Sequence, residues 1–361
     1  MNNWKIGQVK VWKENLELLR PYTIAYTTMT EVENVFVFIQ TENEHFGLGA
    51  ASPSINVTGE SIDSCMKILT EKAETLLLGK DIRELSNLLR LIENEMPKNP
   101  AAQAAIDLAL HDLYGKMLGL PLATILGQVH QALPTSITIG IKSIEETKSD
   151  ARELIETGFK ILKVKTGLSV EKDVQLIREL RQFVGKDIKI RVDANQGYSA
   201  KDLEKFYTQT KELEVEFIEQ PLPKPEYRKM LEVDETIRKT CVADESLQRP
   251  SDALKLAALP QSFGIYNIQL MKCGGIGPAL TIAEIANLAK IDLMWGCMDE
   301  SIISITGALH AALACPATKY LDLDGSIDLA RDIVEEGFIL KDGLMSINDK
   351  PGLGLKLIAK I

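Results

Sequence analysis

The chain has 361 residues, a net charge of −10, and a composition that is 45% hydrophobic and 25% charged. This length is suited to one large α/β barrel with a smaller second domain, and the composition is that of a soluble globular protein. The negative charge argues against a nucleic-acid-binding surface and against a polybasic contact with a membrane.

The cysteines and the apolar segments of the sequence further limit the class of protein to which the chain can belong. The five cysteines are scattered, odd in number and without a CxxC spacing, so we expect free thiols rather than disulfides or a zinc site. The N-terminus has no apolar segment like that of a signal peptide, and no run of about 18 apolar residues is present to span a membrane. We therefore expect a cytoplasmic protein with neither nucleic acid nor membrane as a partner.

The first third of the chain predicts a small α+β domain. Residues 34–40 are β-branched and aromatic, as in a strand, and residues 60–95 carry apolar side chains at helical spacing. The alanine-rich stretch 101–118 is strongly apolar on one face, which is typical of a well-buried helix. We place the end of this domain near residue 125.

The pattern of apolar residues changes near residue 134, where short apolar runs begin to alternate with amphipathic helices. Such alternation predicts βαβ units and a parallel sheet, and eight runs suit a closed barrel. We place the barrel at residues 126–325, and we expect the glycine-containing tail, residues 326–361, to be mostly loop and to pack back on the N-terminal domain. The eight runs are Ile137–Ile141, Ile161–Val164, Ile188–Val192, Glu216–Ile218, Cys241–Ala243, Ile265–Leu270, Ile291–Trp295 and Tyr320–Leu323.

Acidic residues follow three consecutive runs at a regular spacing. Asp193, Glu219 and Asp244 are 26 and 25 residues apart, which is about one βα unit each. Because the active site of such a barrel lies at the carboxyl ends of its strands, the three carboxylates should converge on one rim. Convergent carboxylates repel one another unless a cation lies between them, and an all-oxygen ligand set favours Mg²⁺, with Mn²⁺ as the second choice. The alternative is three unrelated surface acids that cap helices.

Lysines flank these acids on both sides of the expected rim. Lys163 and Lys165 are two apart on one strand, so their side chains point to the same face, and Lys272 follows the sixth run, across the barrel. Two ammonium groups at such a short distance lower each other's pKa, and a nearby dication lowers both further. A lysine with a lowered pKa can act as a general base. Racemisation or epimerisation needs bases on opposite faces of one carbon, and a metal at the substrate carboxylate would stabilise the enediolate. The lysines could instead be solvated strand ends.

These motifs resemble the enolase superfamily, and within it the muconate-lactonizing subgroup with its KxK motif. The resemblance covers nearly the whole chain. It implies a modified (β/α)7β TIM-like barrel with an α+β capping domain built from the N-terminal domain and the tail, and lid loops near residues 20–30 and 50–58. It also implies Lys165 and Lys272 as the catalytic bases, Lys163 as a residue that tunes the pKa, and Mg²⁺ on the three acids. The matching segments are Lys163–Lys165, Asp193–Gln196, Glu219–Pro221, Asp244–Ser246 and Asn267–Ile276.

Asp322 and Asp324 make the expected function more specific. They resemble the DxD signature of dipeptide epimerases, in which the acidic pair binds the N-terminal ammonium of the substrate. Charge-assisted hydrogen bonds to an ammonium group suit two carboxylates, whereas the alternative is a turn before Gly325. We therefore expect Mg²⁺-dependent epimerisation of a dipeptide at the α-carbon of its C-terminal residue.

Three positions depart from relatives that act on Ala-Glu dipeptides. Residues 22–29 contain no arginine to hold a glutamate side chain, Ala50 stands where relatives commonly carry Glu, and Asp299 follows the seventh run where an apolar residue is common. These changes favour a cationic or neutral second residue, although Asp299 could instead cap a helix near Ser301. We also expect substrate contacts from Thr138, Tyr26, Thr27 and Met298, and support from Asn195 and Glu245, with packing as the alternative for Thr138.

Other functions stay open on the sequence. N-succinylamino-acid racemisation, o-succinylbenzoate synthesis and muconate cycloisomerisation need the same lysines and metal, although their substrates present no free ammonium. A Schiff-base aldolase using Lys165 or Lys272, or a non-catalytic binding barrel, is less compatible with the lysine pair and three metal ligands. Gly274, Gly275 and Gly277 predict a tight strand-to-helix turn rather than a phosphate loop, because the GxGxxG pattern is absent. We expect a homo-oligomer.

Overall fold

An eight-stranded parallel barrel forms the centre of the computed structural model, which describes residues 4–19, 22–24, 27–29 and 31–360. The sheet order is β14-β13-β12-β11-β10-β9-β8-β7. A parallel bridge between Thr135, just before β7, and Leu321 in β14 closes the sheet. The strands are β7 (Ile137–Ile139), β8 (Ile161–Lys165), β9 (Lys189–Asp193), β10 (Val215–Glu219), β11 (Cys241–Ala243), β12 (Ile265–Ile268), β13 (Asp292–Gly296) and β14 (Thr318–Asp322).

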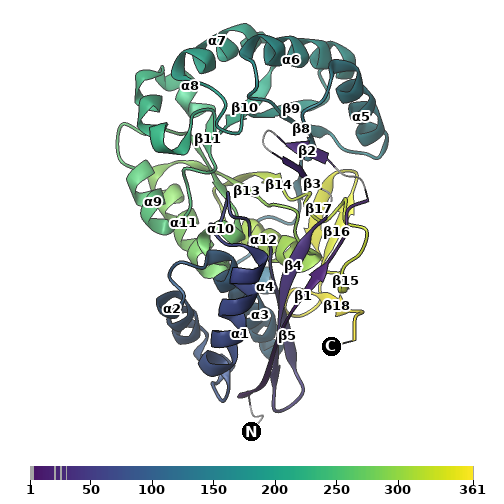
Figure 1. The fold of residues 1–361 in the computed structure, drawn as a ribbon, viewed down its shortest axis with the longest axis vertical. Helices are drawn as coiled ribbons and strands as arrows, with labels where there is room; N and C mark the ends of the chain where they lie inside the picture. Colours follow the sequence, from purple (N-terminus) through teal and green to yellow (C-terminus); the bar gives the residue numbers. More distant parts are fainter. Residues whose placement is uncertain (1–3, 20–21, 25–26, 30, 361) are drawn as a thin grey trace.

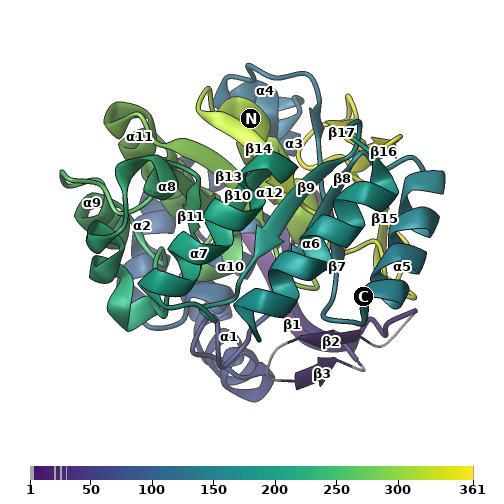
Figure 2. The same ribbon diagram turned by 90° about the horizontal axis from the view of Figure 1, so that it is seen from above.

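Helices follow the first seven barrel strands but not the eighth, so the expected (β/α)7β barrel is confirmed. They cover the outside of the sheet, and in Figure 2 α5 and α9 lie on opposite outer sides. Both faces of the strands are therefore buried, which explains why the strands are apolar runs rather than alternating ones. The barrel helices are α5 (Ile144–Glu156), α6 (Val170–Val184), α7 (Ala200–Thr210), α8 (Glu235–Lys239), α9 (Pro250–Leu256), α10 (Leu270–Cys273), α11 (Ile276–Ala289) and α12 (Ile302–Ala314).

The sixth barrel strand is shorter than expected. β12 ends at Ile268, and the next residue, Gln269, is the N-cap of α10. Its backbone carbonyl accepts hydrogen bonds from the backbone N–H groups of Lys272 and Cys273. The expected run Ile265–Leu270 therefore joins the end of a strand to the start of a helix. Lys272 lies on this one-turn helix, not at the strand end.

The N-terminal domain packs an antiparallel sheet on helices. Strands β1 (Ile6–Asn15), β4 (Glu33–Thr41) and β5 (Phe46–Ala51) form the sheet, and α1 (Ile62–Leu77), α2 (Leu85–Glu95) and α3 (Pro100–Leu118) follow. A Cβ at Gly49 would lie 1.7 Å from the carbonyl oxygen of Ala105, so glycine lets β5 lie directly on α3. α3 is buried on nearly every side rather than along one face, because it also contacts α10, α11 and α12 of the barrel.

The tail is mostly loop, as expected, but it also contains four short strands. These are β15 (Val334–Glu336), β16 (Phe338–Lys341), β17 (Leu344–Ile347) and β18 (Leu355–Leu357), paired as β15-β18 and as β16-β17 with the two-residue strand β6 (Leu133–Pro134). The glycines expected to mark loops are turn residues between strands, with φ of 94° at Gly337 and 73° at Gly343.

The tail packs beside the N-terminal sheet, as Figure 1 shows for the yellow strands next to β1 and β4. Arg331 Nε donates to the carbonyl of Asn15 at 2.8 Å, and the backbone N–H of Leu353 donates to Asp112 on α3 at 2.9 Å. The tail therefore contacts the N-terminal domain, whereas the divisions of the chain at residues 125 and 325 stay predictions. In the described residues, no helix is long and apolar enough to cross a bilayer.

Candidate active site

The carboxyl ends of three neighbouring strands carry the predicted acids. Asp193 ends β9, Glu219 ends β10 and Asp244 follows β11, and the register places Glu219 directly opposite Asp193. β8 and β12 lie four strands apart in a barrel of eight, which places them on opposite sides. Lys165, at the end of β8, and Lys272, on the helix after β12, therefore approach the three acids from opposite sides.

The lysine pair of β8 is held by carboxylates. Lys163 Nζ lies 2.7 Å from Glu219 Oε2, 3.2 Å from Asp193 Oδ2 and 2.6 Å from Asp322 Oδ2. Lys165 Nζ donates to Asp193 Oδ2 at 2.7 Å. The two ammonium groups therefore share Asp193, which makes this carboxylate the link between the metal ligands and the predicted base.

The opposite lysine is bound by the third acid. Lys272 Nζ donates to the carbonyl oxygens of Asp244 at 2.7 Å and Asn267 at 3.1 Å, and it pairs with Asp244 Oδ1. Its side chain is buried, with 1% exposed. Asp244 and Gln269 line the adjacent cavity, so the Lys272 ammonium lies just behind the cavity wall.

The pKa values of the β8 lysines are raised, which is opposite to the expected direction. Burial is the largest single effect and lowers the pKa of Lys165, but Asp193 and Glu219 together raise this pKa more than burial and Lys163 lower it. Burial also lowers the pKa of Lys163, and Asp322, Glu219 and Asp193 together outweigh burial. The acidic neighbours therefore dominate over ammonium–ammonium repulsion. A dication among the same carboxylates would reduce this effect.

The three predicted metal ligands are chemically suited to bind a hard cation. Burial, and then the charge of Asp193, raises the pKa of Glu219 to about 8, and its Oε2 accepts no hydrogen bond although Lys163 is near. Within the described residues, no three Asp, Glu, His or Cys side chains form a ready metal cluster, and lysine ammonium groups contact each of the three acids. Oxygen-only ligands whose charges repel one another suit Mg²⁺ once the ammonium groups move aside.

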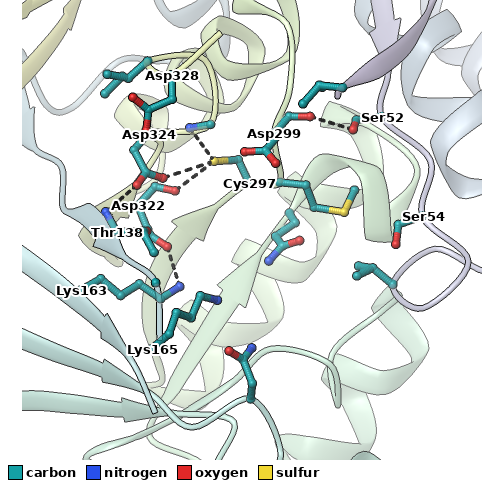
Figure 3. Close-up of a pocket in the computed structure, with 18 of the residues that line it drawn as sticks. Ser52, Ser54, Thr138, Lys163, Lys165, Cys297, Asp299, Asp322, Asp324 and Asp328 are labelled. Carbon is teal, nitrogen blue, oxygen red and sulfur yellow. Dashed lines mark hydrogen bonds and ion pairs between the residues drawn. The ribbon is translucent and has the colours of Figure 1, made fainter. Parts of the chain in front are cut away.

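Asp322 and Asp324 lie where the first and last barrel strands meet. Asp322 Oδ1 accepts a hydrogen bond from Ser136 Oγ at 2.6 Å, and Asp324 Oδ2 accepts one from the backbone N–H of Thr138 at 2.7 Å. Burial, and then the charge of Asp322, raises the pKa of Asp324 to about 7. In Figure 3 the Asp322 carboxylate lies beside Lys163, and the Asp324 carboxylate lies beside Cys297. Asp324 therefore does more than start a turn before Gly325, since it accepts a hydrogen bond from the neighbouring strand β7 and lines the cavity.

A cavity of about 890 Å³ opens over these residues. Lys163 and Lys165 enter it from one side, and Asp299 and Ser52 border it on another (Figure 3). Its described lining includes eleven Asp or Glu side chains and three Lys side chains, so its electrostatic field favours cationic ligands. Thr138 and Met298, which the sequence predicts to contact substrate, and Asn195 and Glu245, which it predicts to support the site, all line the cavity. Asp193, Glu219 and Lys272 lie behind the wall.

The loop that carries Asp299 is held by a residue of the N-terminal domain. Ser52 Oγ donates to the carbonyl of Asp299 at 2.8 Å, so the expected lid loop at 50–58 reaches this position. The N-cap of α12 is Ser301, whose side chain accepts from the backbone N–H of Ile303. Asp299 is therefore a cavity residue and not the helix cap considered above. Thr27 begins the short strand β3 (Thr27–Met29), which pairs with β2 (Tyr22–Ile24), whereas Tyr26 lies outside the described residues.

Two amides that the sequence reasoning left without a role hold the acids. Asn267 Nδ2 donates to Glu219 Oε1 at 2.6 Å, and Gln269 Nε2 donates to Asp244 Oδ1 at 2.9 Å. Asn267 and Gln269 are two residues apart around the end of β12. Because polar residues two apart on a strand share a face, this spacing could have identified them from the sequence. Cys297 adds a thiol that donates to the carbonyl of Asp322 at 3.3 Å.

Comparison with known families accounts for almost the entire chain. Residues 146–361 match the model described as enolase C-terminal domain-like, and residues 6–127 match the N-terminal domain of mandelate racemase and muconate lactonizing enzyme. The chain belongs to the enolase superfamily. The barrel and the capping domain described above are thus those of this superfamily.

Several relatives within the superfamily are similar over their full length. An L-Lys-D/L-Arg epimerase of Desulforapulum autotrophicum is 54% identical over 98% of this chain and 100% of its own, and one of Methylococcus capsulatus is 51% identical over 97% and 99%. The crystal structure of the dipeptide epimerase from Methylococcus capsulatus, complexed with Mg and the dipeptide L-Arg-D-Lys, superposes with a TM-score of 0.96, covering 97% of this chain and 99% of that one at 51% identity.

Proposed function

We propose that this protein is a Mg²⁺-dependent dipeptide epimerase that inverts the α-carbon of the C-terminal residue of cationic dipeptides. The observation that carries the proposal is the placement of Lys165 at the end of β8 and of Lys272 just after β12, four strands away. Asp193, Glu219 and Asp244 lie at or just after the ends of the three strands between them. Two bases on opposite sides of one acidic site are what a 1,1-proton transfer requires.

The lysines carry the proton. Lys165, in its neutral form, takes the α-proton from one face of the substrate, and the Lys272 ammonium returns a proton to the opposite face. The reverse reaction exchanges these roles. Lys163 stays charged between Asp193, Glu219 and Asp322, and so keeps positive charge close to the carbanion-like substrate.

Asp193, Glu219 and Asp244 would hold Mg²⁺, and Asn267 and Gln269 orient two of these acids. When bound, Mg²⁺ supplies the positive charge that stabilises the enediolate form of the substrate carboxylate. The Mg-bound structure of the 51% identical relative supports this choice over Mn²⁺.

The acidic cavity supports a cationic substrate. Asp322 and Asp324 suit the N-terminal ammonium, and Asp299 suits a cationic second side chain. The names of the relatives from Desulforapulum autotrophicum and Methylococcus capsulatus, both L-Lys-D/L-Arg epimerases, point the same way. A racemase of N-succinylamino acids or a muconate cycloisomerase would leave the Asp322/Asp324 pair without an ammonium partner.

One experiment tests the proposal directly. The protein is incubated with Lys-Arg, Lys-Leu and Ala-Glu in D₂O with Mg²⁺, and deuterium at the C-terminal α-carbon and the ratio of epimers are measured. We expect exchange and epimerisation on Lys-Arg, loss of both when a chelator removes the metal, and recovery when Mg²⁺ is added. Preferred turnover of Ala-Glu, or turnover unchanged by the chelator, would contradict the proposal.

Location and assembly belong to the same proposal. The five cysteines are unpaired, which fits the reducing cytoplasm that we propose as the location. We also propose a homo-oligomer, which light scattering of the purified protein tests.

A further inference from the structure

The short helix α10, which carries Lys272, is connected to the N-terminal domain. The next helix, α11, begins after Gly275, which has no side chain to cap it. Its first two backbone N–H groups, of Ile276 and Gly277, donate instead to Oδ1 and Oδ2 of Asp107 at 2.7 and 3.1 Å. Asp107 lies on α3 and is 2% exposed. A carboxylate of the capping domain thus caps a barrel helix four residues beyond a proposed catalytic base.

The turn between α10 and α11 has no room to shift toward α3. Gly274 and Gly275 have φ values of 105° and 113°, which only glycine adopts easily. A Cβ at Gly275 would lie 2.4 Å from Asp107 Cγ, and one at Gly274 would lie 2.4 Å from Gln103 Oε1. The backbone of the turn therefore lies directly on the α3 side chains, and a change in Asp107 moves the turn beside Lys272.

Two further contacts fix this arrangement. His111, one turn along α3, places Nδ1 3.0 Å from Asp107 Oδ1 and 2.9 Å from the Asp107 carbonyl oxygen, and both side chains are buried. The imidazole thereby sets the direction of the carboxylate. From the 50–58 loop, the backbone N–H of Ser52 approaches Met271 Sδ at 3.2 Å. α10 is held by these contacts beside the metal ligands.

We propose that Asp107, oriented by His111, is a positioning residue for Lys272. The inference rests on the proposed epimerase function. It predicts an asymmetric defect, because Lys165 lies on β8, which is not among the described elements that pack extensively against α3. Loss of Asp107 should therefore impair proton transfer on the Lys272 side and spare transfer on the Lys165 side. A helix cap that only stabilised the fold would affect both sides equally.

The test compares α-proton exchange from the two epimers of Lys-Arg, each supplied separately to the Mg²⁺-loaded enzyme in D₂O. The Lys272→Ala enzyme first identifies which epimer loses its proton to Lys272, since that epimer stops exchanging. Asp107→Ala and the milder Asp107→Asn are then measured. Asp112→Ala is the matched control, because Asp112 lies on the same helix, is 0% exposed, and accepts two backbone N–H groups. These come from Leu48 in β5 and Leu353 in the tail rather than from the turn after α10.

In Asp107→Ala, exchange of the Lys272-side epimer should fall by at least about tenfold relative to the other epimer, since small misplacements of a reacting group cost up to about 100-fold. Asp107→Asn should show a smaller bias in the same direction, and Asp112→Ala should keep the wild-type ratio. If Asp107→Ala and Asp112→Ala give the same ratio, the positioning role is wrong. If Asp107→Ala does not fold, Asp107→Asn decides by the same ratio. A wild-type enzyme with no exchange on either epimer would refute the epimerase function instead.

Discussion

Asp299 gives the sharpest test of substrate preference, through the substitution Asp299→Asn. Its side chain is partly exposed and lines a cavity with a strong excess of carboxylates. A cation about 4 Å from one carboxylate gains about 1 kcal/mol in bulk water and about 4 kcal/mol at the effective dielectric constant near a protein surface. Because Asp299 is neither buried nor fully exposed, we expect an intermediate value of about 2 kcal/mol.

This energy translates into a measurable loss of selectivity. Since about 1.4 kcal/mol is a factor of ten, kcat/KM for dipeptides with Lys or Arg as the second residue should fall about 30-fold. The values for a neutral second residue should stay nearly unchanged. The assay is chiral chromatography of Lys-Arg and Lys-Leu time courses, with Asp328→Asn as the control, because Asp328 lines the same cavity but is exposed. An equal loss on Lys-Arg and Lys-Leu would refute the charge argument.

Three further predictions concern catalysis and stability. Lys165→Ala and Lys272→Ala should each lower epimerisation at least about 1,000-fold while exchange survives from one epimer, and a symmetric loss of exchange in both would contradict the two-base assignment. Within the barrel, Arg191 donates to the Leu321 carbonyl at 2.6 Å and to Glu216 at 2.8 Å, so Arg191→Leu should lower the free energy of unfolding in urea by about 3 kcal/mol. The control is Lys189→Leu, which removes the ion pair of an exposed lysine with the same Glu216 and should cost less than about 1 kcal/mol. Burial raises the pKa of Glu300 from 4.5 to about 7, so between these pH values the folded protein keeps a proton that the unfolded chain loses. The contribution of this proton to the free energy of unfolding is fully present below pH 4.5 and is lost as the pH rises through 7. Glu300→Gln should remove this loss and gain about 3 kcal/mol relative to wild type between pH 4.5 and 8, and identical pH profiles of urea unfolding would show that the proton is not held.

The periodic part of the fold could be predicted from the sequence. Eight apolar runs recur at intervals of a βα unit, and a carboxylate or lysine at the end of a run must lie at one rim of the barrel. That logic placed Asp193, Glu219 and Asp244 on consecutive strand ends without any knowledge of contacts. It overextended the sixth run, because Leu270 is apolar both at the end of a strand and at the start of α10.

Contacts between distant segments could not be predicted in the same way. The bond from the Thr138 N–H to Asp324 joins residues 186 apart, and the cap that Asp107 gives to Ile276 joins residues 169 apart. No local pattern marks either pair. The pKa direction of Lys165 was also missed, because it depends on how many carboxylates face the ammonium, and only the packed site sets that balance.

The closure of the barrel has a consequence for how such enzymes change their substrates. Strands β8 to β12 form one continuous arc that carries the lysines and the acids, whereas β13, β14 and β7 form the other arc, with Asp299, Asp324 and Thr138. With the roles proposed above, proton chemistry and substrate recognition would therefore occupy separate halves of the mouth. Because no helix follows β14, side chains just beyond it can be exchanged without repacking a helix against the sheet. New dipeptide preferences can arise on the second arc while the chemistry of the first is inherited intact.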